Sequence, residues 1–196
     1  MTGVDSAAQA LAVLENVGSE ITAATVPSFQ AVYAKYFDFV WASTRRLGVN
    51  ASAIDDVVQD IFIAIHSHLH TLQRPEALKS WIYSVARRTV SNHNRAVRAR
   101  GGNATTNAFD ELESQQPTPF EVTQKNSDLQ LLGKLLAELE ELKREVFTLV
   151  EIEEMTVPEV ADALDIPVNT AYSRLRAARL AFEAAVARHD ARDKRK

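Results

Sequence analysis

The sequence predicts an all-α protein made of two small helical domains joined by a flexible linker. Three observations predict it. Apolar residues recur at helical spacing through most of the chain, and no segment alternates convincingly at period two. A long polar stretch without apolar periodicity separates two helical parts. The length of 196 residues suits one ordinary domain or two small ones.

The chain divides into five parts on this basis. These are an N-terminal extension (residues 1–26), a first helical domain (27–100), a linker (101–127), a second helical domain (128–190) and a basic tail (191–196). The linker is rich in Gly, Asn, Thr, Ser, Gln and Pro. An ordered surface loop is the alternative, but unstructured loops of this length are uncommon inside compact domains.

Four helices are predicted before the linker, at Ser6–Ile21, Phe29–Leu47, Ala53–Leu69 and Ala77–Arg100. Each carries apolar residues three or four positions apart, which places them on one face of a helix. The second ends before Gly48, and Pro75 separates the third from the fourth.

Three helices are predicted after the linker, at Leu129–Val150, Val157–Leu164 and Asn169–Ala187. The second begins with a capping box, in which Thr156 and Glu159 satisfy free backbone N–H groups. Ala161 is small enough for two helices to cross closely at that point.

A short turn at residues 165–168 leads into the last helix, whose N-cap we expect to be Asn169. Ala171, Leu175 and Ala178 are expected to face inward, while the arginines face outward. This pattern is typical of a helix-turn-helix, with a second helix suited to the DNA major groove. The alternative is a basic helix hairpin that binds a protein.

Charge is sorted along the chain, although the net charge is only −4. Residues 79–100 carry six bases and no acid, whereas residues 128–154 carry eight acids and three bases. Basic segments separated by acidic ones suggest two contacts with a polyanion.

Composition and motifs exclude several classes of function. The absence of cysteine removes disulfides and thiolate sites, and no run of 18 apolar residues is present to span a bilayer. The N-terminus lacks the basic stretch of a secretion signal, so we expect a cytoplasmic protein without membrane insertion. No enzyme motif occurs, and we expect no catalytic residue and no cofactor. His66, His68 and His70 fall on different helix faces, so no metal site is expected.

Three stretches together resemble a bacterial RNA polymerase sigma factor of the extracytoplasmic-function (ECF) type. Asp55–Phe62 (DDVVQDIF) resembles region 2.2, and Ser80–Arg87 (SWIYSVAR) resembles the start of regions 2.3 and 2.4. Lys143–Phe147 (KREVF), followed by the helix-turn-helix, resembles region 4. The resemblance implies a transcription initiation factor that binds core RNA polymerase and directs it to promoter DNA.

The resemblance also implies sites. Core polymerase would bind an acidic helix through Asp56, Gln59, Asp60 and Phe62. We expect Phe62 to be an exposed aromatic anchor there, while the carboxylates steer a basic partner. The alternative for the carboxylates is a solvated face that favours the helix dipole.

Two further sets of residues would contact DNA. The promoter minus-ten element would be recognised and melted by Lys79, Arg87, Arg88, Asn92, Arg95 and Arg98. The loop from His70 to Leu78 would hold a flipped base; Tyr83 suggests base stacking, whereas Trp81 is expected in the core. The minus-thirty-five element would be read by Asn169, Thr170, Tyr172, Ser173, Arg174, Arg176 and Arg179. We expect Arg174 to contact a base and Arg179 a phosphate.

An anti-sigma factor is the third partner that the resemblance implies, since one protein could clamp both domains. The sequence also allows three other classes of protein. They are an enzyme, a stand-alone helix-turn-helix repressor that binds its duplex unaided, and an adaptor that binds only protein.

Overall fold

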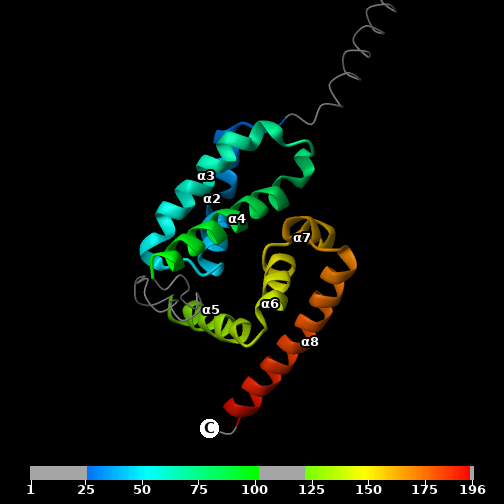
Figure 1. Cartoon of the computed structure of the whole chain (residues 1–196). Helices are drawn as coiled ribbons and strands as arrows, with labels where there is room; N and C mark the ends of the chain where they lie inside the picture. The colour runs from blue at the N-terminus through cyan, green and yellow to red at the C-terminus, as the bar shows by residue number, and fades with distance from the viewer. Residues whose placement is uncertain (1–25, 102–121, 195–196) are drawn as a thin grey trace, which may run out of the picture.

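A computed structural model describes residues 26–101 and 122–194 of the chain. Every regular element in these ranges is helical, which confirms the predicted all-α class (Figure 1). The helix predicted at Ser6–Ile21 and most of the predicted linker lie outside the described residues. The elements, in chain order, are α2 (Phe29–Arg46), η1 (Ala51–Ala53), α3 (Ile54–His68), η2 (Leu69–Thr71), η3 (Pro75–Ala77), α4 (Leu78–Ala99), α5 (Val122–Ala137), α6 (Glu141–Phe147), η5 (Thr148–Ile152), α7 (Val157–Leu164) and α8 (Val168–Asp193).

The N-terminal unit, residues 26–101, is a bundle in which α2, α3 and α4 pack on one another (Figure 1). Its bounds follow from local chemistry. The Ser28 side chain accepts a hydrogen bond from the Ala31 N–H at 3.3 Å and caps α2. Gly48 follows the end of α2 at φ 82°, a conformation that costs glycine little. The three helices predicted here are confirmed to within one residue at most ends.

The C-terminal unit, residues 122–194, departs from the prediction at its start. The sequence predicts a linker up to residue 127 and one helix over Leu129–Val150. Instead, α5 begins at Val122, within the predicted linker, and ends at Ala137, and α6 begins at Glu141 and is followed by the π-helical segment η5. The connection between α5 and α6, residues 138–140, contains neither Gly nor Pro, and Leu139 within it is only 4% exposed. Because Leu139 continues the apolar pattern, the sequence carries no signal of the change in direction between α5 and α6 (Figure 1).

The helix-turn-helix forms as predicted in α7 and the start of α8. The capping box is present, because the Thr156 Oγ1 accepts from the Glu159 N–H and the Glu159 carboxylate accepts from the Thr156 N–H. Asp165 ends α7 in the left-handed conformation, at φ 54°. The prediction of Asn169 as N-cap is wrong. Pro167 holds that position, and its carbonyl accepts from the backbone N–H groups of Thr170 and Ala171.

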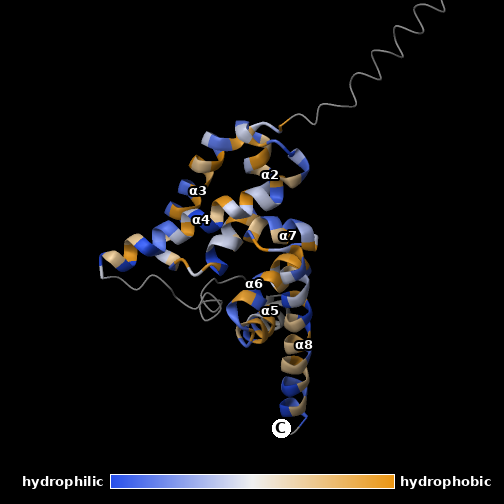
Figure 2. Cartoon of the chain, turned by 45° about the vertical axis from the view of Figure 1, so that its right-hand side comes forward, coloured by the Kyte–Doolittle hydropathy of each residue, from blue (hydrophilic) through white to orange (hydrophobic). Residues whose placement is uncertain are grey.

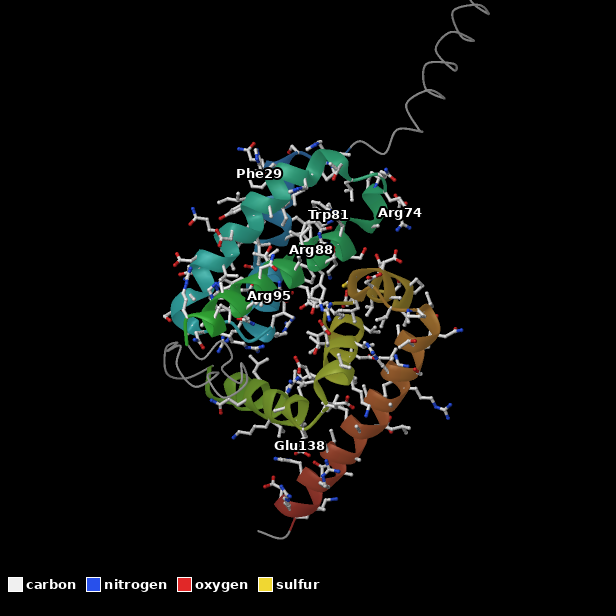
Figure 3. The ribbon with its side chains drawn as sticks, viewed as in Figure 1. Phe29, Arg74, Trp81, Arg88, Arg95 and Glu138 are labelled. Atoms are coloured by element: carbon white, nitrogen blue, oxygen red, sulfur yellow. The ribbon has the colours of Figure 1, made fainter. Side chains whose placement is uncertain are left out.

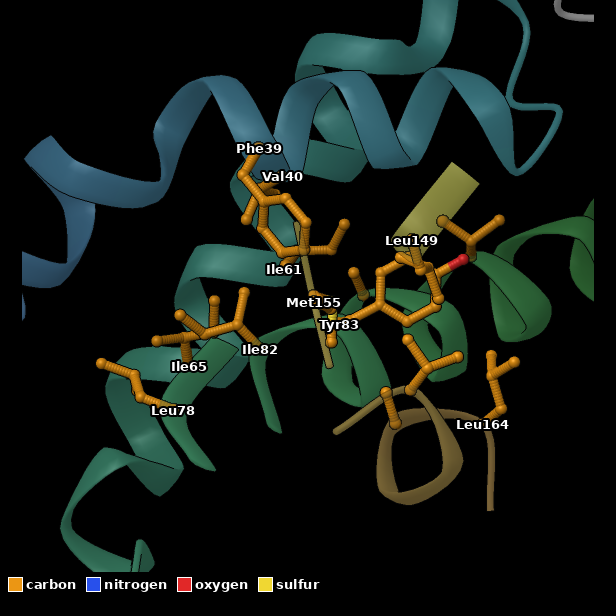
Figure 4. Packing of buried hydrophobic residues seen from close by; sticks show 14 of the residues in the cluster. Phe39, Val40, Ile61, Ile65, Leu78, Ile82, Tyr83, Leu149, Met155 and Leu164 are labelled. Carbon is orange, nitrogen blue, oxygen red and sulfur yellow. The ribbon is translucent and has the colours of Figure 1, made fainter. Parts of the chain in front are cut away.

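The two units share a hydrophobic core. Helix α7 packs against α4, and most of the buried residues of both units form one cluster. Figure 4 shows Tyr83 of α4 beside Leu149 and Met155 of the C-terminal unit. A smaller cluster joins α5, α6 and α8, where the Phe147 and Phe182 rings stack with centroids 4.9 Å apart. Apolar and polar residues alternate along each ribbon in Figure 2, as amphipathic helices require.

Candidate macromolecular interfaces

The first candidate interface is the acidic surface of α3. Asp56, Gln59 and Asp60 are all exposed, so their side chains are available to a partner. The expectation that Phe62 is an exposed anchor is wrong, because only 4% of this residue is accessible. Phe62 lies on the buried stripe of α3, between Val58 and Ile65, so helical spacing directs its ring toward α2.

A groove between α2 and α3 borders the acidic surface. Its volume is about 610 Å³, and the residues lining it all come from these two helices: Phe29, Tyr33, Phe37, Asp55, Val58, Gln59, Phe62, Ile63 and His66. The ring centroid of Phe62 lies 4.6 Å from that of Tyr33 and 6.1 Å from that of Phe37, to which it is nearly parallel. Phe62 therefore forms the floor of the groove.

Tyr33 and Ile63 form the accessible apolar part of this groove and were missed in the sequence. They are 44% and 57% exposed, respectively. Phe29, Tyr33 and Phe37 recur every four residues, which is the signal that could have identified an aromatic strip on α2. An apolar groove next to exposed carboxylates suits a partner helix that is basic and carries an apolar anchor.

The second candidate interface is the basic face of α4. Arg88, Asn92, Arg95 and Arg98 are exposed along this helix, and Figure 3 shows Arg88 and Arg95 along α4. These residues extend over about three turns, from Arg88 to Arg98, a spacing that suits a phosphate backbone. This face contains four of the six residues that we predicted for the minus-ten element.

The other two predicted residues, Lys79 and Arg87, make contacts with the C-terminal unit. The Arg87 Nε donates to the Glu145 carboxylate at 3.1 Å. The Lys79 Nζ lies 3.8 Å from the Glu153 carboxylate and donates to the Glu153 backbone carbonyl. The Lys79 Nζ also lies 4.9 Å from the centroid of the Phe39 ring. In this structure both cations are engaged within the protein.

Tyr83, for which the sequence suggests base stacking, is not accessible to a base in this structure. It is buried, with 4% of its surface accessible, and its hydroxyl donates to the Glu145 carboxylate at 3.0 Å. Burial raises the pKa of Tyr83 well above its ordinary value, and the adjacent Glu145 carboxylate raises it further. Tyr83 is therefore a neutral donor in the shared core.

A small pocket marks the loop that we predicted to hold a base. Its volume is about 270 Å³, and it is lined by Thr71, Leu72, Gln73, Arg74, Ala77, Ser80, Trp81, Ser84 and Asp162. Trp81 is half-buried. It packs against the core, as expected, and it also lines this pocket. Asp162 comes from α7, and its carboxylate accepts from the Arg74 Nη2 at 3.1 Å.

The third candidate interface is the outer face of α8. Ala171, Leu175 and Ala178 are buried, as predicted, so the intervening side chains face outward. Asn169, Tyr172, Ser173, Arg176 and Arg179 are exposed, and Thr170 and Arg174 are half-buried. The Arg179 Nε donates to the Glu151 carboxylate at 2.7 Å.

Arg174 lies near the carboxylate of Glu140 at the start of α6. Lys143 makes the largest contribution to lowering the pKa of the Glu140 carboxyl, and the charge of Arg174 also lowers it. Arg176 is exposed and lies on the opposite side of α8 from Arg174, since two residues turn a helix by about 200°. The two arginines therefore cannot contribute equally to one groove.

Within residues 26–101 and 122–194, no three His, Asp or Glu side chains gather as a metal ion would need. No helix of the described part has the length and apolar character to cross a membrane.

Two protein-family models match this chain. The model for Sigma-70 region 2 matches residues 32–100, and the model for Sigma-70, region 4 matches residues 129–182. Together they cover the N-terminal unit from α2 onward and most of the C-terminal unit.

Individual proteins match over most of their length. The ECF RNA polymerase sigma-E factor of Escherichia coli is 26% identical over 166 residues, which are 80% of this chain and 85% of that protein. The RNA polymerase sigma factor CnrH of Cupriavidus metallidurans is 24% identical over 163 residues, with the same coverage.

Two solved structures share the fold. One is CnrH in complex with the cytosolic domain of CnrY, with a TM-score of 0.54, 21% identity, and coverage of 81% of this chain and 86% of CnrH. The other is the sigma factor RpoE in complex with the anti-sigma factor NepR from Bartonella quintana, with a TM-score of 0.62 and 19% identity. It covers 81% of this chain and 96% of RpoE.

Proposed function

Because the chain belongs to the sigma-70 family, as a sigma factor of the ECF type, it is a transcription initiation factor, and we propose that it binds core RNA polymerase through the groove between α2 and α3. Sigma factors are regulatory proteins rather than catalysts, so the alternative of an enzyme is set aside, and membership of this family sets aside the stand-alone repressor.

The observation that carries this proposal is the pairing of an apolar groove with exposed carboxylates. Tyr33 and Ile63 supply apolar surface that a partner side chain would cover, and Asp56 and Asp60 lie on the same helix as Ile63. Covered apolar anchors contribute most of the affinity of an interface, while exposed charges mainly set its orientation and rate of formation. This division of roles replaces the expectation that Phe62 is itself the anchor.

Binding to purified core polymerase tests the docking surface. We expect the double substitution Asp60→Lys with Ile63→Ser to weaken binding about tenfold or more, since it reverses a charge and removes an apolar anchor. The matched control is Asp190→Lys with Leu180→Ser, which makes similar changes at two exposed positions of α8. Equal affinities for the two variants, with unchanged helical circular dichroism, would contradict the docking assignment.

For the DNA contacts, we propose that the N-terminal unit meets the minus-ten element and the C-terminal unit the minus-thirty-five element. The exposed row on α4 supports the first assignment, and the pocket beside Trp81 is large enough to receive part of an unstacked base. The helix-turn-helix geometry supports the second, because residues near the start of α8 project away from its buried stripe.

An anti-sigma factor is the third proposed partner. RpoE, one of the structural neighbours, was solved in complex with the anti-sigma factor NepR. Support within this chain comes from exposed apolar residues on the C-terminal unit, which a partner would cover: Leu129, Leu142, Ile152 and Leu180.

A further inference from the structure

Two carboxylates of the C-terminal unit each bind a pair of donors from the N-terminal unit. Glu145 accepts from the Tyr83 hydroxyl at 3.0 Å and from the Arg87 Nε at 3.1 Å. Glu153 accepts from the Arg46 Nη1 at 2.6 Å and also lies beside Lys79. The two glutamate side chains are only 13% and 14% exposed, so water does little to screen these contacts.

A third carboxylate lies at the pocket beside Trp81. Asp162 pairs with Arg74 at 3.1 Å, although both side chains are more than half exposed and the pair is therefore weak. Its importance is its position, because Asp162 and Arg74 both line the pocket proposed for an unstacked base. Figure 3 shows Arg74 on the segment that leads into α4, at the side of the bundle where α7 lies.

Apolar packing brings these three carboxylates to the N-terminal unit. Helix α7 packs against α4, and Leu149 and Met155 are 1% and 2% exposed within the cluster that includes Tyr83 (Figure 4). The contact therefore combines buried apolar surface with charge pairs, and both would be lost if the units separated.

The arrangement explains the charge pattern of the sequence. Residues 79–100 carry six bases and no acid, and residues 128–154 carry eight acids against three bases. The structure brings the two segments together, so that Glu145 and Glu153 of the acidic segment meet Arg87 and Lys79 of the basic one. The carboxylates bind the same cations that a phosphate backbone would bind.

We propose that the C-terminal unit acts as an internal competitor of DNA, in which Glu145, Glu153 and Asp162 (the three bridging carboxylates) bind Arg74, Lys79 and Arg87 in the free chain and so withhold this part of the minus-ten surface. This inference rests on the proposed function of that surface. The groove between α2 and α3 is lined only by residues of those two helices, so a polymerase helix that binds in this groove displaces none of the three bridging carboxylates. Binding of phosphates to Arg74, Lys79 and Arg87, on the other hand, displaces the carboxylates that pair with these cations, and so removes contacts that hold the C-terminal unit on α4.

The test removes the three negative charges without changing the size of the side chains. The variant is Glu145→Gln, Glu153→Gln and Asp162→Asn in the full chain. The matched control is Glu141→Gln, Glu183→Gln and Asp190→Asn, three exposed acids of the C-terminal unit with the same residue types. Each protein also carries Ser52→Cys and Ala187→Cys for a pair of fluorescent dyes, which the absence of native cysteine makes selective.

Two readouts follow for each protein. The first is energy transfer between the dyes, which reports separation of the units without DNA or polymerase. The second is affinity for a mixed-sequence single-stranded oligonucleotide of about twenty nucleotides, at about 0.1 M salt, where exposed charges still act. We expect the variant to lose energy transfer and to bind the oligonucleotide roughly tenfold more tightly than the matched control does.

Unchanged energy transfer together with an affinity equal to that of the control would overturn the proposal. Circular dichroism shows whether a loss of energy transfer comes from unfolding. If the triple variant unfolds, the single variant Glu153→Gln takes its place, and unchanged energy transfer with an unchanged affinity in that variant would overturn the proposal. Binding to core polymerase is measured in parallel. A variant that opens and binds the oligonucleotide tightly but fails to bind polymerase would support the internal competitor and contradict the proposed docking function.

Discussion

Two surfaces of the N-terminal unit differ in their availability. The groove between α2 and α3 is open, with Tyr33 and Ile63 each more than two-fifths exposed. Helix α4, on the other hand, packs against α7, and Lys79 near its start is bound by Glu153, which lies in the turn before α7. One small bundle therefore presents its proposed polymerase surface while part of its proposed DNA surface is engaged by the same chain.

The difference has a physical origin in charge. The rim of the open groove is acidic, and the C-terminal segment nearest in sequence to α7 is also acidic, so the two would repel. The start of α4 is basic and attracts that segment. The distribution of charge along the sequence thus favours closure over the DNA surface and disfavours closure over the polymerase groove.

The largest expected effect comes from the apolar part of the closed contact. Leu149→Ala removes a side chain that is 1% exposed in the shared cluster, and we expect it to lower the free energy of unfolding by about 2–5 kcal/mol. Urea unfolding followed by circular dichroism measures this loss. Leu180→Ala, at a position 60% exposed, is the control and should change stability by about 0.5 kcal/mol or less. Similar losses for the two variants would show that Leu149 is not part of a packed core in solution.

An intermediate effect distinguishes two adjacent arginines of α4. Both are exposed, but the Arg87 guanidinium is paired with the Glu145 carboxylate, so we expect Arg88 to be the more available of the two to DNA in the closed chain. We expect Arg88→Ala to weaken binding of single-stranded DNA by the free chain and to lower the salt slope by about one. Arg87→Ala should have little effect in the same assay.

The same two substitutions are then compared in a protein that carries Glu145→Gln, in which Arg87 has lost its carboxylate partner. There Arg87→Ala should weaken DNA binding about as much as Arg88→Ala does. Fluorescence anisotropy at two salt concentrations measures both slopes. An equal effect of the two substitutions in the native background would mean that Arg87 is as available as Arg88, and the closed contact would not compete with DNA.

Much of the fold could be predicted from the sequence, because the relevant signals are local. The helices of the N-terminal unit, the capping box at Thr156 and the inward set Ala171, Leu175 and Ala178 all follow from spacing and backbone chemistry. The break between α5 and α6 could not be predicted. It needs no Gly or Pro, and Leu139 keeps the apolar period through it.

The candidate interfaces were predicted less completely, because exposure depends on packing between distant segments. Asp56 and Asp60 are exposed as expected, but Phe62 is covered by aromatic rings of α2 that lie about thirty residues earlier. Tyr83 is likewise covered, in this case by the C-terminal unit. A helical pattern identifies the face on which a residue lies, but it does not identify the segment that packs there.

The smallest expected effect concerns the Tyr83 hydroxyl. Tyr83→Phe removes one hydrogen bond to Glu145, a carboxylate that keeps its contact with Arg87, so we expect a loss of about 0.5–1.5 kcal/mol in the free energy of unfolding at neutral pH. The difference between the two proteins should depend on pH in a defined direction. Because the pKa of Tyr83 is raised in the folded state, its contribution is fully present below the unfolded value of about 10.

Above that pH the unfolded chain releases the Tyr83 proton while the folded chain retains it, so the native protein loses stability relative to Tyr83→Phe. The free energies of unfolding of the two proteins should therefore converge as the pH rises from 10 toward the higher folded-state pKa. Other titrating groups are common to both proteins and cancel in the difference. Urea unfolding at several pH values from about 7 to 11 measures it, with Tyr172→Phe, at a position 54% exposed, as the control. A difference that stays constant over this range would place Tyr83 in contact with water. The closed contact seen here, in which Glu145 joins α4 to the C-terminal unit, would then not be the dominant state of the free chain.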